Sequence, residues 1–370
     1  MIKFATIFRD FEKIHITKDV GMIPMAMTKI TERKSSIFYW CREKNVDAEI
    51  YRDLVDLRPI KASGRLHFIF KVLMMIIREK FTVVNLYHIK NETLLFALIL
   101  QCLSIDVYLK LDMDTTGVED LKKKHDNIIY KIIMQYIIKK IQYISVESLT
   151  ILSELKSLNC CFYNTKLIAN AILTETVLAP RTDFSSREDI ILISGRIGVY
   201  QKNHELILSS LERINDLMNW EIVFAGPVED DFWSRIEKSQ ISSVVKNRIK
   251  FVGELNRKEL FELYARTKIF LLPSRREGFS LALLEAAFMG CYIVATDVGG
   301  VREVTKDGYF GCIFPQEGVH ELSNIITAIV NGKLDIANNY DKRVSYIEET
   351  FNIESNLRKI NWNKMNGCSI

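Results

Sequence analysis

Residues 270–290 read Phe270-Leu-Leu-Pro-Ser-Arg-Arg-Glu-Gly-Phe-Ser-Leu-Ala-Leu-Leu-Glu-Ala-Ala-Phe-Met-Gly290 and decide how the rest of the chain is interpreted. The first apolar run predicts a buried strand that ends at Pro273, and the apolar run after Ser280 predicts a helix. Ser280 is suited to cap that helix, while Gly278 lets the backbone approach a ligand closely. Because the N-terminus of a helix favours anions, the segment predicts a phosphate site at the end of a strand.

Two glutamates lie on either side of this expected helix terminus. Glu277 belongs to the loop, and Glu285 follows on the helix eight residues later. Both carboxylates can accept hydrogen bonds from hydroxyl groups. Glutamate pairs at this spacing are common, so the pair indicates a site only through its context: a strand, a glycine-containing turn, an apolar helix, a further strand and then Asp297-Val-Gly-Gly300.

This context resembles the donor-site signature of the retaining glycosyltransferases of family 4, which have the two-domain GT-B fold. The resemblance implies that Glu277 contacts hydroxyls of the donor sugar and that Glu285 holds the ribose of the nucleotide. It also implies that the backbone of four residues holds the donor phosphates: Gly278, Phe279, Ser280 and Leu281. By the same resemblance, Gly253 ends the strand beside the nucleotide base.

A second matching element is Gly195-Arg-Ile-Gly-Val-Tyr-Gln-Lys-Asn203, which follows an expected strand. Arg196 can bind a diphosphate through two parallel hydrogen bonds, and Lys202 can act as a point charge. Taken alone, the two cations would be interpreted as solvated surface charges. The resemblance instead implies that Gly195 lines the donor site and that both cations neutralise the leaving diphosphate, although this chain has Asn203 where the family usually has glycine.

Short apolar runs alternate with helix-period stretches along the chain, which predicts βαβ units and parallel sheets. Strands are expected at 3–7, 47–51, 82–86, 106–111, 142–146, 166–168, 189–194, 220–225, 249–252, 269–272 and 292–296. With the resemblance, this predicts an α/β protein of GT-B architecture, in which two Rossmann-like α/β/α domains face a central cleft. The polar stretch 179–187 is the expected linker. We expect an acceptor-binding domain at 1–183, a donor-binding domain at 184–345 and a C-terminal helix at 346–370 that crosses back to the N-terminal domain.

The first half resembles the family less closely. Gly21 takes the place of a glycine-containing loop near the transferred sugar, with an ordinary turn as the alternative. His88 follows an expected strand and is assigned to the acceptor side, with a purely structural histidine as the alternative. Asp112 ends the next strand, where many relatives have histidine, and is expected to hydrogen-bond the donor sugar or the incoming hydroxyl. Lys110 is expected on the acceptor side, paired with Asp112.

Other functions are distinguished by features of the sequence. Asp112-Met-Asp114 has the spacing of the metal-binding motif of GT-A glycosyltransferases. We expect no metal, because Arg196, Lys202 and the helix terminus supply the positive charge. A dinucleotide-dependent oxidoreductase requires a Gly-x-Gly-x-x-Gly turn, which neither half contains. A non-catalytic relative that binds nucleotide sugars stays open, as does a phosphorylase or sugar-nucleotide epimerase of the same fold.

Composition limits the partners. The 370 residues are 48% hydrophobic and 26% charged, as in ordinary folded proteins, and the net charge of +4 excludes a dedicated nucleic-acid binder. Residues 1–180 hold 26 basic and 20 acidic side chains, a net of +6. Residues 65–80 and 127–141 combine basic and apolar side chains. Two interpretations of these stretches stay open: helices packed on the sheet with a solvated basic face, or helices resting on an anionic membrane surface.

Targeting signals are not evident. The first 15 residues carry charges where a signal peptide needs an apolar run, no apolar stretch suits a transmembrane helix, and the seven cysteines form no Cys-x-x-Cys pair. We therefore expect a cytoplasmic protein, peripheral on the inner face of the cell membrane.

The expected function is that of a retaining, metal-independent glycosyltransferase without a cofactor. It would move a hexose-type sugar from a UDP- or GDP-sugar to a glycan or polyprenyl-linked acceptor, in the biosynthesis of bacterial surface polysaccharides such as capsule or O-antigen.

Overall fold

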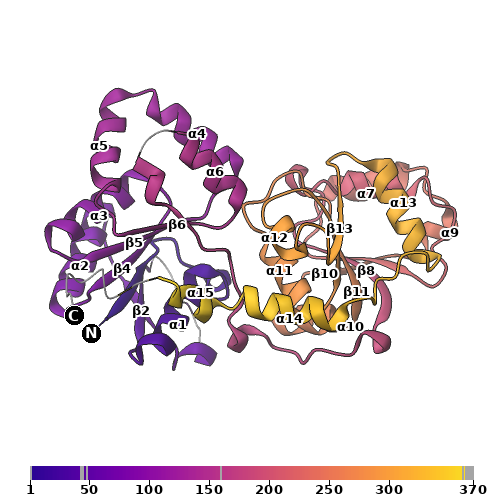
Figure 1. The fold of residues 1–370 in the computed structure, drawn as a ribbon, viewed down its shortest axis with the longest axis horizontal. Coiled ribbons are helices and arrows are strands. Elements are labelled where there is room, and N and C mark those ends of the chain that lie inside the picture. The colour runs from indigo at the N-terminus through magenta and orange to yellow at the C-terminus, as the bar shows by residue number, and fades with distance from the viewer. Residues whose placement is uncertain (1, 42–45, 47–48, 159–160, 361, 363–370) are drawn as a thin grey trace. The chain divides into compact units, whose positions relative to one another are not determined.

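The chain forms two compact units, each built around one parallel sheet (Figure 1). The computed structural model describes residues 2–41, 46, 49–158, 161–360 and 362. The first unit comprises Met1–Leu173 and Phe351–Ile370, and the second comprises Thr174–Thr350. The predicted α/β class is confirmed.

The sheet of the first unit has seven strands in the order β3-β2-β1-β4-β5-β6-β7, all paired in parallel. In chain order they are β1 (Phe4–Ile7), β2 (Ser35–Trp40), β3 (Val55–Ile60), β4 (Val83–Tyr87), β5 (Asp106–Leu111), β6 (Tyr143–Val146) and β7 (Lys166–Leu167). The strand order reverses between β1 and β4, where Ala5 pairs with Val84. Ligands of open parallel sheets bind at the carboxyl ends of strands at such a reversal.

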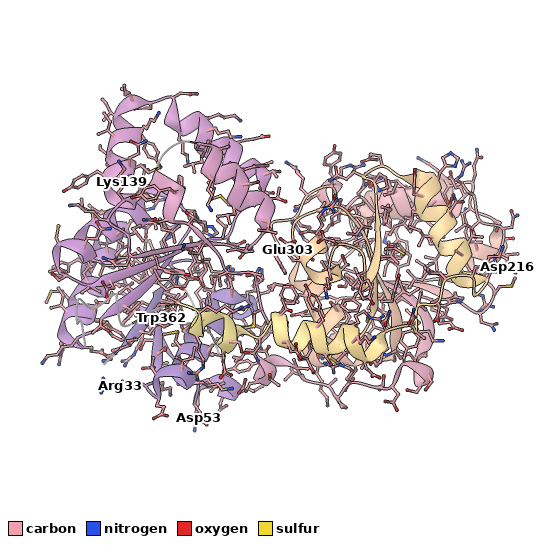
Figure 2. The ribbon with its side chains drawn as sticks, in the orientation of Figure 1. Arg33, Asp53, Lys139, Asp216, Glu303 and Trp362 are labelled. Atoms are coloured by element: carbon pink, nitrogen blue, oxygen red, sulfur yellow. The ribbon has the colours of Figure 1, made fainter. Side chains whose placement is uncertain are left out.

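Helices cover both faces of this sheet. They are α1 (Asp19–Thr31), α2 (Arg65–Arg78), α3 (Asn91–Cys102), α4 (Thr115–His125), α5 (Ile128–Ile138), α6 (Leu149–Ser157) and α15 (Ile353–Arg358). Right-handed crossovers place α1 on one face and α2, α3 and α5 on the other. The last helix, α15, packs against α1, and Trp362 (Figure 2) contacts the rings of Phe4 and Tyr108 edge-on at 5.9 and 5.8 Å. Residues Ile353–Arg358 and Trp362 therefore pack against the first unit.

The sheet of the second unit has six parallel strands in the order β10-β9-β8-β11-β12-β13. They are β8 (Glu188–Ser194), β9 (Glu221–Ala225), β10 (Ile249–Gly253), β11 (Thr267–Leu272), β12 (Tyr292–Thr296) and β13 (Gly311–Phe314). The order reverses between β8 and β11. The helices are α7 (His204–Leu211), α8 (Asp230–Lys238), α9 (Ser243–Lys246), α10 (Arg257–Arg266), α11 (Leu281–Phe288), α12 (Val301–Thr305), α13 (Val319–Val330) and α14 (Tyr340–Thr350).

The predicted linker at 179–187 is wrong, and the units divide at Thr174 rather than at residue 184. Arg187 is buried, and its guanidinium donates to the carbonyl oxygens of Thr267 (2.8 Å) and Met289 in the second unit. Thr182 Oγ1 donates to Ala265 O in the same unit. A polar, aperiodic stretch is held in place here by hydrogen bonds to carbonyls of the second unit. The second boundary likewise lies after Thr350 rather than after residue 345, because α14 continues to that residue.

The strand predicted at 47–51 is also wrong for residues 49–51. Residues 47–48 lie outside the described residues, and Glu49–Tyr51 form a short 3-10 turn. Among the helices in the described part of the chain, none combines the length and the apolar character needed to cross a bilayer.

Candidate functional site

In the second unit, the predicted site residues gather where the strand order reverses. The loop after β8 carries Gly195 to Asn203, and the loop after β11 carries Pro273 to Ser280. Since β8 and β11 are neighbours in a parallel sheet, both loops leave the same edge. The predicted site residues of the two loops therefore lie at one edge of the sheet.

A short ion pair joins the two loops. Lys202 Nζ lies 2.6 Å from Glu277 Oε1, and only 18% and 10% of the two side chains are exposed. The same carboxylate oxygen accepts a hydrogen bond from Ser274 Oγ at 2.8 Å. Gln201 joins the two loops further. Its side-chain Nε2 donates to Arg276 O at 3.0 Å, and its main-chain oxygen accepts from the N–H of Arg275 at 2.9 Å. Two predicted catalytic side chains thus meet directly.

The loop after β8 depends on unusual backbone conformations. Gly195 has φ +139°, and a Cβ built on it would lie 3.7 Å from Lys202 Cε, so the lysine stem passes over the glycine. Asn203 has φ +52° and precedes α7. Asparagine tolerates this left-handed conformation better than most residues, which explains why it can replace glycine here. Arg196 is exposed and has no hydrogen bond or ion pair to the described residues.

The terminus of α11 follows the sequence expectation. Ser280 precedes the helix, which begins at Leu281, and Ser280 Oγ accepts a hydrogen bond from the N–H of Leu283 at 3.4 Å. Phe279 is buried. The turn at Gly278 packs closely against Gly299, where an added Cβ would lie 2.1 Å from Gly278 O. Glycine is therefore required at 299, in the segment that follows β12.

Glu285 has a partner that the sequence did not reveal. Its Oε1 accepts a hydrogen bond from Arg257 Nη1 at 2.9 Å, and no described residue donates to its Oε2. Burial raises the pKa of Glu285, and the guanidinium of Arg257 opposes this effect. Nearby, Gly253 O accepts a hydrogen bond from the N–H of Gly226 at 2.7 Å, which links the ends of β9 and β10. Glu285 thus presents one oxygen that is free to accept hydrogen bonds.

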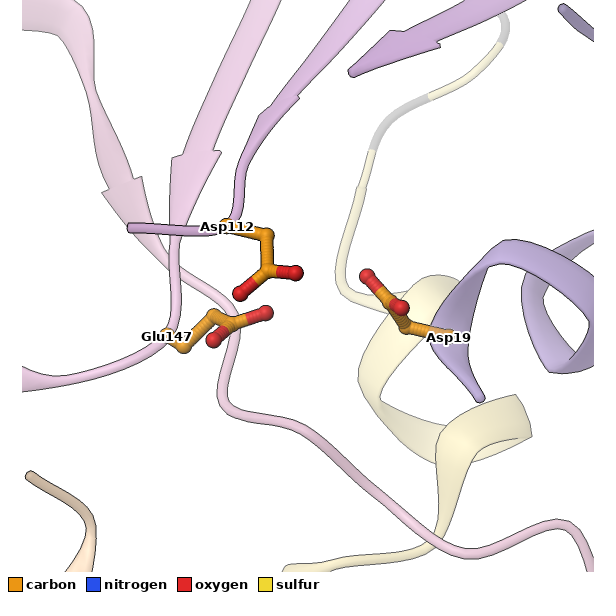
Figure 3. Close-up of side chains that lie close together, drawn as sticks. All are labelled: Asp19, Asp112 and Glu147. Carbon is orange, nitrogen blue, oxygen red and sulfur yellow. The ribbon is translucent and has the colours of Figure 1, made fainter. Parts of the chain in front are cut away.

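In the first unit, a buried lysine organises a cluster of acids at the ends of β5 and β6. Lys110 Nζ lies 2.6 Å from Glu147 Oε1, 3.1 Å from Asn170 Oδ1 and 3.5 Å from Asp19 Oδ2. Figure 3 shows the carboxylates of Asp19, Asp112 and Glu147 pointing toward one another, and one oxygen of each lies within 4.8 Å of the others. We call Asp19, Lys110, Asp112 and Glu147 the acidic cluster. The prediction that Lys110 pairs with Asp112 is wrong, because Glu147 and Asp19 lie closer to its ammonium group.

Burial is the main influence on the pKa values of the two buried carboxyls in the acidic cluster. It raises the pKa of Asp19 to about 6 and that of Glu147 well above its usual value, although Lys110 opposes both shifts. Burial lowers the pKa of Lys110, but Glu147 and Asp19 outweigh it and leave that pKa raised. Asp112 is the exposed member. The buried hydroxyl of Tyr87 makes no hydrogen bond to the described residues, so a polar group stays unsatisfied at the end of β4.

The remaining predicted residues of this unit lie near that edge. His88 has φ +58°, and its Nδ1 lies 2.9 Å from Asp112 O. Burial lowers the pKa of His88. His88 also lines a pocket with Phe8, Tyr87 and Phe96 at the ends of β1 and β4. Gly21 is not in a loop as expected: it lies in the first turn of α1, where a Cβ would stand 2.0 Å from Ile16 O.

Asp114 does not join the acidic cluster. Its Oδ1 caps α4, accepting from the N–H of Gly117 at 3.0 Å and from Thr116 Oγ1 at 2.5 Å. The group of carboxylates with metal-ligand spacing is instead Asp19, Asp112 and Glu147. Lys110 already places a positive charge against two of those three. The two aspartates of Asp112-Met-Asp114 therefore have different surroundings: Asp112 lies in the acidic cluster, and Asp114 caps α4.

We expect Lys110→Met to lower the free energy of unfolding by about 3 kcal/mol at pH 8, because it leaves two buried carboxylates without their cation. Without the ammonium, the folded-state pKa values of Asp19 and Glu147 rise further above their unfolded values. The loss should therefore be larger at pH 8 than at pH 5, where the carboxyls hold protons. Urea unfolding at both pH values measures it, with the exposed Lys156→Met as the control. An equal, small loss in both variants would contradict the role given to Lys110.

Comparison with known proteins finds a family that the second unit resembles. Residues 177–350 match the family described as glycosyl transferases group 1. This match covers almost all of the second unit. A gpi3 subunit of phosphatidylinositol N-acetylglucosaminyltransferase from Schizosaccharomyces pombe is 26% identical over 46% of this chain and 36% of its own length. A lipopolysaccharide core mannosyltransferase, LpcC, from Rhizobium leguminosarum is 26% identical over 35% of this chain and 38% of its own. The matched segments thus span less than half of these relatives.

Solved structures match both units. Sucrose-phosphate synthase from Thermosynechococcus elongatus superposes with a TM-score of 0.78 over 100% of both chains at 13% identity. HepE from Anabaena in complex with UDP gives a TM-score of 0.75 over 99% of this chain and 100% of that chain at 14% identity. At these identities the likeness establishes the fold alone, which is the GT-B fold of two parallel-sheet α/β units.

Proposed function

We propose that the protein is a glycosyltransferase that uses a nucleoside-diphosphate sugar as its donor. The observation that carries the proposal is the Lys202–Glu277 ion pair, held between two loops at the strand-order reversal of the second unit. It combines a cation for phosphate with a carboxylate for sugar hydroxyls beside the N-terminus of α11. That UDP is bound in the solved structure of HepE supports the same class of donor.

The proposed mechanism assigns one task to each side chain. Arg196, Lys202 and the amides near Phe279 stabilise the charge that develops on the leaving diphosphate, in the manner of preorganised electrostatic stabilisation. Glu277 orients the donor sugar, and the free oxygen of Glu285 accepts hydrogen bonds from ribose. The acceptor hydroxyl attacks the face that the diphosphate leaves, and the departing phosphate oxygen takes its proton. The reaction then retains the anomeric configuration and needs no metal, as in family 4.

The acceptor side is assigned to the first unit. Asp112 is exposed beside His88, at the same sheet edge as the pocket lined by Phe8 and Tyr87. We propose that Asp112 accepts a hydrogen bond from the incoming hydroxyl. The names of relatives in lipopolysaccharide core and phosphatidylinositol glycosylation support a glycan or lipid-linked acceptor, in bacterial surface polysaccharide biosynthesis. A protein with such an acceptor would act in the cytoplasm, at the inner face of the cell membrane.

Donor turnover tests the stereochemistry and the metal independence together. The purified chain is incubated with UDP- and GDP-hexoses and a lipid-linked acceptor, with and without EDTA. We expect release of nucleoside diphosphate that EDTA leaves unchanged, and a product whose anomeric configuration, measured by NMR, equals that of the donor. An inverted product would contradict the family 4 mechanism. Loss of turnover in EDTA would instead favour a metal at Asp19, Asp112 and Glu147.

A further inference from the structure

Three helices of the first unit form a continuous layer on one face of its sheet. Phe68 of α2 contacts Phe96 of α3, with ring centres 6.4 Å apart. Gln101 Nε2 of α3 donates a hydrogen bond to Ile137 O of α5 at 3.1 Å. Figure 1 shows α2, α3 and α5 along the same side of the sheet. The inward side chains of this layer, among them Phe68 and Ile137, belong to the hydrophobic core.

On α2 and α5, many of the outward side chains are apolar as well. On α5 the exposed members, with their exposed fractions, are Ile128 (70%), Ile129 (67%), Ile132 (61%), Ile133 (53%) and Tyr136 (56%). On α2 they are Leu66 (76%), Phe70 (63%), Met74 (52%) and Ile77 (47%). We call these nine residues the apolar face. Large apolar side chains that are exposed together on a helix in this way mark an interaction site.

The apolar face favours the second of the two interpretations left open by the sequence, a helix that rests on a membrane surface. A helix that merely packs on the sheet would present a solvated, polar outer face. On α5 the residues turned toward the core are Met134, Ile137 and Ile138, and the isoleucines of the opposite side are exposed. Both sides of α5 therefore need an apolar neighbour, and the described residues supply one for the inner side only.

The charged side chains on α2 and α5 themselves have one sign. Neither α2 nor α5 contains an aspartate or a glutamate. Lys71 and Arg78 on α2 are exposed, as are Lys139 (Figure 2) and Lys140 after α5. A second copy of this face would set these cations against one another. A partner that is both apolar and anionic fits better, and a bilayer with acidic headgroups has both properties.

A pocket on α2 fits the same partner. It has a volume of about 480 Å³ and is lined by Phe70, Met74 and Met75, among other apolar side chains, together with Lys61 and Lys71. Apolar walls next to two ammonium groups suit an acyl chain below an anionic headgroup. The pocket is continuous with the apolar face, because Phe70 and Met74 belong to both.

We propose that the apolar face of α2 and α5 is a membrane-binding surface, which inserts into the headgroup region of an anionic bilayer while the neighbouring lysines and arginines contact the lipid phosphates. This proposal deepens the proposed function, because it names the surface that would bring the enzyme to a lipid-linked acceptor. Only the identity of that acceptor rests on the proposed function. The binding itself requires neither a donor nor catalysis.

The test is co-sedimentation of the full chain with vesicles of phosphatidylcholine alone or mixed with phosphatidylglycerol. We expect binding to the mixed vesicles, weakened at high salt, and at least about tenfold weaker binding by the double variant Ile129→Asn, Ile133→Asn. Val244→Asn, at a 52% exposed position of α9, is the matched control and should bind like the wild type. Because all three positions are more than half exposed, thermal unfolding should be unchanged in every variant.

Three results would overturn the proposal. The wild type could stay in the supernatant with both kinds of vesicle, or the double variant could bind as tightly as the wild type. Light scattering could also show a dimer that the double variant abolishes, which would make a second copy the occupant. Donor binding, measured on the same preparations without vesicles, separates these outcomes from a failure of the proposed function.

Discussion

Replacing Arg196 or Lys202 with alanine is expected to lower the turnover of glycosyl transfer by about 10²–10³-fold, the usual loss when one preorganised electrostatic group is removed from a transition state. Arg196 is exposed and has no partner among the described residues, so its removal should leave the unfolding temperature unchanged. Lys202 is paired with Glu277 at 2.6 Å, so its removal should also lower stability modestly. Steady-state release of nucleoside diphosphate measures the effect.

The matched control is Arg213→Ala, which removes an exposed cation after α7 in the same unit. Its turnover should equal that of the wild type. If the Arg196 and Lys202 variants both keep wild-type turnover, the assignment of the two cations to the leaving diphosphate is wrong. A loss in the Lys202 variant alone would restrict the role to the pair with Glu277.

Replacing Glu285 with glutamine is expected to weaken the binding of nucleoside diphosphate by about 10- to 100-fold. Hydrogen bonds to a charged group contribute about 1.5–3 kcal/mol each, and the carboxylate would lose this advantage toward the ribose hydroxyls. Isothermal titration of the wild type and the variant measures the change. The effect should appear in the affinity for the free nucleoside diphosphate, because its ribose is bound both before and after sugar transfer.

The control for Glu285 must separate binding from folding, since the substitution also leaves Arg257 without its anionic partner. Glu262→Gln, at an exposed position of α10, tests the removal of a carboxylate from the same unit. The unfolding temperature without ligand reports the cost of the broken pair. Unchanged affinity in a folded Glu285→Gln variant would show that this carboxylate does not hold the nucleotide.

The sequence predicted the second unit best. Five of its six strands were predicted, four of these five are largely buried runs, and β12 was predicted with the bounds that the structure has. The first unit was harder. The outermost strand, β3, reads Val55-Asp-Leu-Arg-Pro-Ile60 and is only partly buried, so it lacks an apolar run and contains a proline that a strand tolerates at an edge.

The candidate site could likewise be predicted only in part from the sequence. Sequence patterns indicated which residues end a strand, such as Asp112, or begin a helix, such as Ser280. They did not indicate partners that the fold brings together from a distance. Arg257 and Glu285 are 28 residues apart, and Lys110 and Glu147 are 37 apart. No local periodicity encodes such pairs, because they depend on which strands are neighbours in the sheet.

The central claim, a nucleotide-sugar site in the second unit, is tested most directly by a thermal-shift panel of nucleoside diphosphates and nucleotide sugars with and without EDTA. A ligand at 100 times its dissociation constant stabilises the folded state by about 2.7 kcal/mol, which shifts the unfolding temperature measurably. We expect a shift with one base, unaffected by EDTA and strongly reduced in Glu285→Gln. No shift with any nucleotide at saturating concentration would contradict it.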